Sequence, residues 1–90
     1  MTVNELGHEL SIMYDNALEG EKATMVHLFG IHYSKVIREN RISIHEILRN
    51  TMLRNGSRID DGYSSEINKG VNLAKYVIER KGLLSYINNN

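Results

Sequence analysis

Apolar residues recur at helical spacing along most of this chain, and no proline interrupts them. A proline inside a helix removes a backbone hydrogen bond and clashes with the preceding turn, so its absence suits a largely helical chain. In segment 3–18 the apolar residues fall on one face of a helix with a period of 3.6: Val3, Leu6, Leu10, Met13, Tyr14, Ala17 and Leu18. The 90 residues can build one modest core. We therefore predict an all-α fold, a small bundle of four or five helices in one domain, 1–90.

The first predicted helix has recognisable ends. Thr2 or Asn4 can cap its start, and Gly20 is expected to end it. Gly7, inside this helix, costs about 1 kcal/mol relative to Ala. Such a residue can mark the close approach of a neighbouring backbone.

A second helix is predicted over residues 21–39, with apolar side chains around most of its circumference. Such a helix is buried at the centre of its bundle or shared with another subunit. We favour partial burial in a homodimer interface. Gly30 either lets another helix pass close by or is a tolerated weak position.

Residues 42–70 form the most informative segment, ISIHEILRNTMLRNGSRIDDGYSSEINKG. A short amphipathic helix is predicted over 43–53, where Ser43 and Glu46 have the spacing of a capping box. Asn-Gly and Asp-Gly turn signals follow in the connector 54–62, and Asp61 can cap a second helix over 63–69 that Gly70 ends or kinks. The residues expected to face the core are Ile44, Ile47, Leu48 and Met52 from the first helix, and Tyr63, Ile67, Val71, Leu73, Ala74 and Val77 from the second helix onward.

Two parts of this segment resemble a known motif. ISIHEIL at 42–48 is similar to the T-I-x-D-V-A opening of lactose-repressor-type and phage-repressor helix-turn-helix motifs, and GYSSEINKG at 62–70 is similar to their V-S-x-x-T-V-S-R-V-L-N-G end. The connector is longer than the usual turn of three or four residues. The resemblance implies a helix-turn-helix domain, which presents the start of its second helix to the major groove of double-stranded DNA.

The resemblance also implies which side chains would contact DNA. Ser64, Ser65, Asn68 and Lys69 are expected to point outward from the second helix, where Ser, Asn and Lys can bond base edges and phosphates. Phosphate contacts are expected from five arginines: Arg38, Arg41, Arg49, Arg54 and Arg58. Arg38 and Arg41 can instead complement a helix C-terminus, and the connector is either a mobile loop, a wing-like excursion or a small hairpin headed by Asn55 and Gly56.

Charge is unevenly distributed along the chain. Residues 1–21 sum to −5 and residues 22–58 to +5, while the whole chain has no net charge. A DNA-binding domain is often basic, and an acidic N-terminal segment held away from the duplex would account for the difference. The predicted function is a bacterial or phage transcription regulator that binds DNA. The alternative is a helical module that binds a protein partner in a defence or regulatory complex.

Several other functions are disfavoured. The chain has no cysteine and no HExxH motif, and His27 and His32 are five residues apart, not three or four, so they do not share a helical face that could bind one metal ion. No nucleophile, base and acid combination or phosphate-binding loop is present, so we expect no cofactor, no metal and no enzymatic activity. Without a signal sequence or an apolar run of about 20 residues, a cytoplasmic protein is expected. The apolar tail, with Leu83, Leu84, Tyr86 and Ile87, is expected to dock on its own domain or on a second copy.

Overall fold

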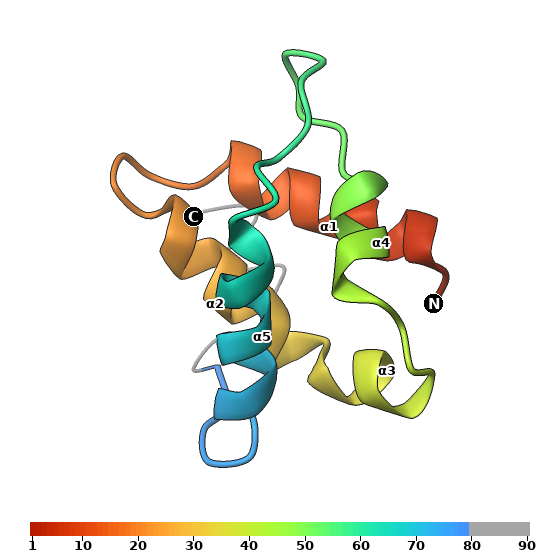
Figure 1. Cartoon of the computed structure of the whole chain (residues 1–90). Coiled ribbons are helices and arrows are strands. Elements are labelled where there is room, and N and C mark those ends of the chain that lie inside the picture. Colours follow the sequence, from red (N-terminus) through yellow and green to blue (C-terminus); the bar gives the residue numbers. More distant parts are fainter. Residues whose placement is uncertain (80–90) are drawn as a thin grey trace.

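A computed structural model describes residues 1–79 of the chain (Figure 1). These residues form helices α1 (Val3–Asp15), α2 (Lys22–His32), α3 (Ser34–Glu39), α4 (Ile44–Arg49) and α5 (Tyr63–Leu73). The predicted all-α fold with five helices is confirmed over this part of the chain. The predictions for the apolar tail fall outside the described residues.

Helix α1 begins as predicted but ends early. The Thr2 hydroxyl accepts from the backbone N–H of Glu5 at 3.1 Å, and the Glu5 carboxylate accepts from the backbone N–H of Thr2 at 2.7 Å. This is a complete capping box. The prediction that Gly20 ends the helix is wrong, because the Asn16 carboxamide and backbone N–H both donate to Ile12 O and close the last turn. Gly20 lies in the following loop with a φ of 80°.

The second predicted helix is two helices, because the chain bends at Tyr33, where ψ is 13°. Tyr33 is buried, and its ring lies 5.1 Å from that of Phe29. Burial raises the pKa of the Tyr33 hydroxyl to about 12. This bend separates α3 from α2 and directs α3 toward the start of α4 (Figure 1).

Helices α2 and α5 make the closest helix contact in the described fold, and two glycines permit it. A Cβ on Gly30 would lie 2.5 Å from the carbonyl oxygen of Ile67, and the Cα atom of Gly70 would lie 3.0 Å away. A Cβ on Gly70 would likewise be too close to the backbone carbonyl of His27. The prediction that Gly70 ends or kinks the second helix is therefore wrong: α5 continues through it because α2 fills the space that a side chain would need. Of the two explanations for Gly30, the close approach is confirmed.

The core lies where α1, α2, α4 and α5 meet. Its buried apolar side chains are Leu6, Leu10, Met13, Met25, Val26, Phe29, Tyr33, Ile37, Ile47, Leu48, Ile59, Ile67 and Val71. Most of α2 is thus covered within one chain. Gly7 lets α1 pack against the backbone of Asn50 at the end of α4, as its position suggested.

Three residues that the helical pattern assigned to the core are exposed instead: Met52 by 56%, Leu73 by 42% and Val77 by 45%. Helix α4 ends at Arg49 and α5 at Leu73, so Met52 and Val77 do not continue a helical stripe. The connector supplies Ile59 to the core in their place. No helix within residues 1–79 is long and apolar enough to cross a membrane.

Candidate nucleic-acid interface

The corner between α3 and α4 is closed by a backbone motif centred on Arg41. The Ile42 N–H donates to Ile37 O at 3.0 Å, and the Arg41 N–H donates to Arg38 O at 3.2 Å. These two bonds define a Schellman motif, which places the residue after the C-cap in the left-handed region. That residue is usually glycine, but here it is Arg41, with a φ of 51°. The corner holds this arginine, which is exposed, at the end of α3.

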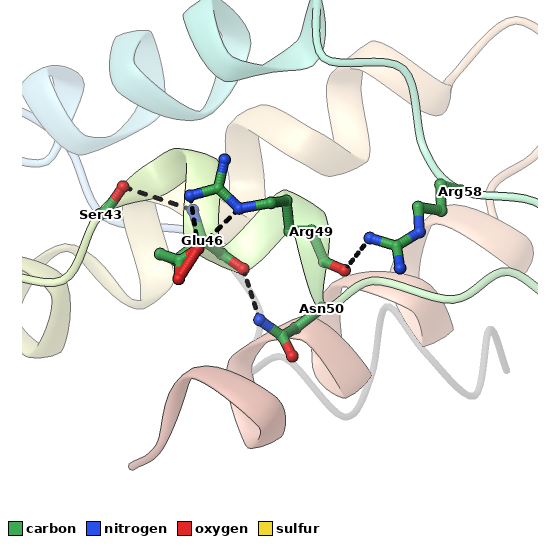
Figure 2. A network of polar contacts seen from close by, with 5 residues as sticks. All are labelled: Ser43, Glu46, Arg49, Asn50 and Arg58. Atoms are coloured by element: carbon green, nitrogen blue, oxygen red, sulfur yellow. Dashed lines mark hydrogen bonds and ion pairs between the residues drawn. The ribbon is translucent and has the colours of Figure 1, made fainter.

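Helix α4 starts at the predicted cap. The Ser43 hydroxyl accepts from the Glu46 N–H at 3.3 Å. The second half of the predicted capping box is wrong, because the Glu46 carboxylate turns to Arg49 instead, at 2.5 Å from Nη2 and 2.7 Å from Nε (Figure 2). The helix is also shorter than the predicted 43–53, since Asn50 caps its C-terminus. Both members of the pair remain largely exposed to solvent.

The connector carries a small hairpin, one of the alternatives left open by its sequence. The Leu53 N–H donates to Ser57 O and the Gly56 N–H donates to Leu53 O, both at 2.9 Å, while Met52 and Arg58 form an antiparallel bridge. Gly56 has a φ of 86°, as such a turn requires. The hairpin projects away from the helices (Figure 1).

Three contacts fix this hairpin to the helices. The Arg58 guanidinium donates to the carbonyl oxygen of Arg49 at the end of α4 (Figure 2). The backbone N–H of Arg54 donates to Asp15 Oδ2 at 2.8 Å, which ties the hairpin to the end of α1. Ile59 is buried in the core. The connector is thus a structured excursion, and its two arginines lie on the hairpin.

Helix α5 starts at the predicted residue, but the predicted cap is wrong. No side chain caps it in the described structure, and the Asp60 carboxylate, in place of that of Asp61, accepts from the Gly62 N–H at 2.8 Å. The Tyr63 ring packs edge-on against Tyr14 of α1, with the ring centroids 5.5 Å apart. This contact fixes the direction in which α5 leaves the connector.

One side of α5 pairs with α2 through charged groups. Glu66 Oε1 lies 2.6 Å from His27 Nε2, and Glu66 Oε2 lies 3.5 Å from Lys69 Nζ. Desolvation raises the pKa of Glu66, but Lys69 and His27 together outweigh it, and the pKa is lowered. Lys69 therefore lies on the flank of α5 nearest α2.

The opposite side of α5 faces an open groove of about 530 Å³, formed with α3 and the start of α4. Its lining residues are Ile37, Arg38, Arg41, Ile42, Ile44, His45, Ser64, Ser65, Asn68 and Val71. None of these is acidic, and none comes from the acidic α1, which packs against α2 and α4. Arg38 Nη2 donates to Val71 O at 3.2 Å and connects α3 to α5 across one end of the groove.

With this geometry in place, comparison with known proteins identifies the family. The family model described as HTH-like domain matches residues 2–80. The chain belongs to the HTH-like domain family. Comparisons with curated proteins and with solved structures returned no match.

The HTH-like domain brings only part of the predicted DNA-contact set together. The groove gathers five of the predicted residues: Arg38, Arg41, Ser64, Ser65 and Asn68. Arg49, Arg54 and Arg58 lie on α4 and the hairpin, and Lys69 lies on the flank of α5 that faces α2. The predicted outward direction holds for Ser65, Asn68 and Lys69, whereas Ser64 is half-buried.

No sequence pattern predicted that His45, Ile42 and Ile44 would line the groove together with α5. His45 precedes Arg49 by one helical turn, so the two basic residues lie on the same face of α4. Arg49 does not line the groove, so this spacing does not predict that His45 does. Within residues 1–79 no cluster of three or more potential metal ligands occurs.

Proposed function

We propose that this HTH-like domain binds double-stranded DNA through the groove between α3, α4 and α5, and that it is a bacterial or phage transcription regulator without enzymatic activity. The observation that carries the proposal is the gathering of Arg38, Arg41 and the outward side chains of α5 around one open surface with no acidic lining residue. Arginine binds phosphates, and serine and asparagine bind phosphates or base edges.

The distribution of charge supports this orientation. The segment 1–21, which sums to −5, contributes nothing to the groove lining, so the acidic part of the chain does not compete for the arginines there. Arg49 and Arg58 lie where α4 meets the hairpin (Figure 2), and Arg49 is paired with Glu46 of its own helix. Arg58 is partly engaged, because it donates to the Arg49 carbonyl.

The test is a fluorescence-anisotropy titration with a random-sequence DNA duplex at several salt concentrations. Release of counterions from the duplex gives a log–log slope of about −0.9 per neutralised phosphate, so contacts from two to four arginines predict a slope between about −2 and −4. An unchanged affinity across salt, or no binding at about 50 mM salt, would contradict the proposal.

A matched pair of variants locates the contact. Arg41→Gln removes a charge that lines the groove just after α3, and Lys35→Gln removes one from α3 itself at a position that does not line it. We expect Arg41→Gln to weaken binding and to reduce the salt slope by about 1, because one phosphate contact is lost. Lys35→Gln should leave both nearly unchanged, and equal effects of the two variants would rule out the groove as the binding surface.

The second candidate function is binding of a protein partner. It is favoured by a set of exposed apolar side chains at and beyond the end of α5, namely Leu73, Tyr76, Val77 and Ile78. A surface of this kind suits a protein contact better than a phosphate backbone. Absence of DNA binding in the titration, together with co-purification of a partner that Ile78→Ser abolishes, would favour this function.

A further inference from the structure

We propose that Asn68 is the specificity-determining residue of the groove and that it recognises adenine in an A·T base pair. This inference rests on the DNA-binding function proposed above. It concerns which base is selected, so it can fail while DNA binding itself stands.

The first argument is the state of the Asn68 carboxamide. Asn16, Asn40 and Asn50 each donate the side-chain N–H to a carbonyl four residues earlier, and so close the ends of their helices. The carboxamide of Asn68 makes no hydrogen bond with any other described residue. Asparagine in a helix interior is also unfavourable relative to alanine. Asn68 thus costs helix stability and leaves a donor and an acceptor available to a ligand.

The second argument is position. Asn68 lies in the middle of α5, is exposed, and lines the groove one turn after Ser64 and one turn before Val71. A carboxamide presents one donor and one acceptor side by side, which matches the N7 acceptor and the N6 amino donor of adenine in the major groove. Ile42 and Ile44, half-buried in the facing wall, offer apolar contact to a thymine methyl group.

The third argument concerns guanine, which arginine recognises best. Arg38 is already bonded to the Val71 carbonyl, so its guanidinium is partly engaged within the protein. Arg41 is held at the corner between α3 and α4, on the opposite wall from α5. Of the polar side chains of α5 that line the groove, Ser65 donates to the Gly62 carbonyl and Ser64 is half-buried, so the exposed Asn68 is the best placed to bond a base edge.

The experiment is selection of duplexes from a randomised DNA pool by the full-length protein, followed by anisotropy with the enriched sequence. We expect one adenine in the enriched site whose replacement by guanine weakens binding about 5- to 150-fold. Replacing the same base by 7-deazaadenine, which lacks the N7 acceptor, should also weaken binding.

Two variants separate this role from a general one. Asn68→Ala should bind with less than about a threefold preference for adenine at that position, because the bidentate pair is lost. Asn72→Ala is the matched control, because Asn72 lies one turn later on α5 and lines a different hollow with His27 and Tyr76. It should keep the preference, and circular dichroism of both variants checks that α5 remains folded.

The outcomes are distinguishable. Salt-dependent DNA binding without an adenine preference, or a preference that survives Asn68→Ala, overturns the assignment of Asn68 and leaves the proposed function in place. Recovery of no DNA by the wild-type protein overturns both.

Discussion

Arg41 occupies a left-handed backbone position that glycine would occupy at lower cost. A non-glycine residue there loses about 1 kcal/mol, since its Cβ crowds the backbone. Its guanidinium, however, lines the groove at the point where α3 turns into α4. If the groove binds DNA, arginine at this corner makes the fold less stable than glycine would, but it supplies a phosphate contact.

Arg41→Gly should therefore stabilise the fold and weaken DNA binding at the same time. We expect urea denaturation to show a gain of about 1 kcal/mol in the free energy of unfolding, and anisotropy to show reduced affinity. Arg41→Ala is the control, because alanine removes the charge but retains the backbone strain. An alanine variant as stable as the glycine variant would show that the left-handed conformation carries no cost.

Individual residues also show what could be predicted from sequence. The caps at Thr2 and Ser43 were correct because capping depends on neighbours three residues away. Arg41 and Ile59 could not be predicted in this way. A Schellman corner is normally signalled by glycine, and Ile59 lies in a connector whose burial depends on distant helices.

At the scale of elements, the contact between α2 and α5 determines the fold. Gly30 and Gly70 allow the two backbones to touch, and no side chain could be accommodated at either position without moving a helix. The sequence left a close approach at Gly30 as one of two explanations, and it could not identify the partner helix. The end of α5 was also misjudged, because a glycine that lets helices pack looks the same in sequence as one that ends a helix.

Gly30→Ala should strongly destabilise the domain. Overpacking typically costs 1–3 kcal/mol, and the obstacle here is the Ile67 carbonyl, so we expect a loss of about 2 kcal/mol or more even after the gain in helix propensity. Gly62→Ala is the control, since its Cβ would approach only the Asp60 side chain, at 3.3 Å. Urea denaturation that shows equal stability for Gly30→Ala and wild type would contradict the observed helix crossing.

The same pair of helices carries a pH-dependent contact between Glu66 and His27. Lys69 and His27 hold the pKa of Glu66 below its ordinary value of 4.5 despite some desolvation. A carboxylate with a lowered pKa stabilises the folded state above the unfolded-state pKa, and this contribution disappears as the pH falls through the folded-state pKa.

We therefore expect wild type to lose stability on acidification from about pH 5 to about pH 3, and Glu66→Gln to lose less over the same interval. Urea denaturation at a series of pH values measures both. Glu46→Gln is a useful control, because it removes a carboxylate whose partner, Arg49, belongs to the same helix. Identical pH profiles for wild type and Glu66→Gln would show that the contact between Glu66 and His27 does not contribute to the pH dependence of stability.

At the scale of the whole molecule, the sequence predicted the correct fold class and motif type, and membership of the HTH-like domain family agrees with both. It could not give the groove, because the groove exists only where α3, α4 and α5 meet in space. The predicted contact set accordingly lies on more than one surface. It joined residues from the groove, the hairpin and the α2 flank of α5 that share a charge or polarity but not a surface.

The predicted homodimer remains a prediction. The dimer was predicted because α2 is apolar nearly all round, but α1 and α5 of the same chain cover most of that apolar surface. Exposed Tyr76 and Ile78 give a different reason, because a second copy could bury them, and a chain without net charge has no overall repulsion from its copy.

We expect sedimentation equilibrium at high protein concentration to give a mass near twice that of the 10.3-kDa chain. Ile78→Ser should lower the measured mass toward that of one chain. Leu18→Ser, at an exposed apolar residue between α1 and α2, should not. If the wild-type protein has the mass of one chain at all concentrations, the homodimer prediction is wrong.

The glycine contact also determines which parts of the groove can move. Because Gly30 and Gly70 lock α2 and α5 into one rigid pair, the α5 wall cannot shift by itself. Because α4 is packed against α1 at Gly7, a change in the width of the groove is expected to come from α3, which is joined to α2 by the bend at Tyr33 and to α5 by the Arg38 bond to Val71. The bend at Tyr33 is therefore the hinge through which we expect the groove to adjust to what it binds.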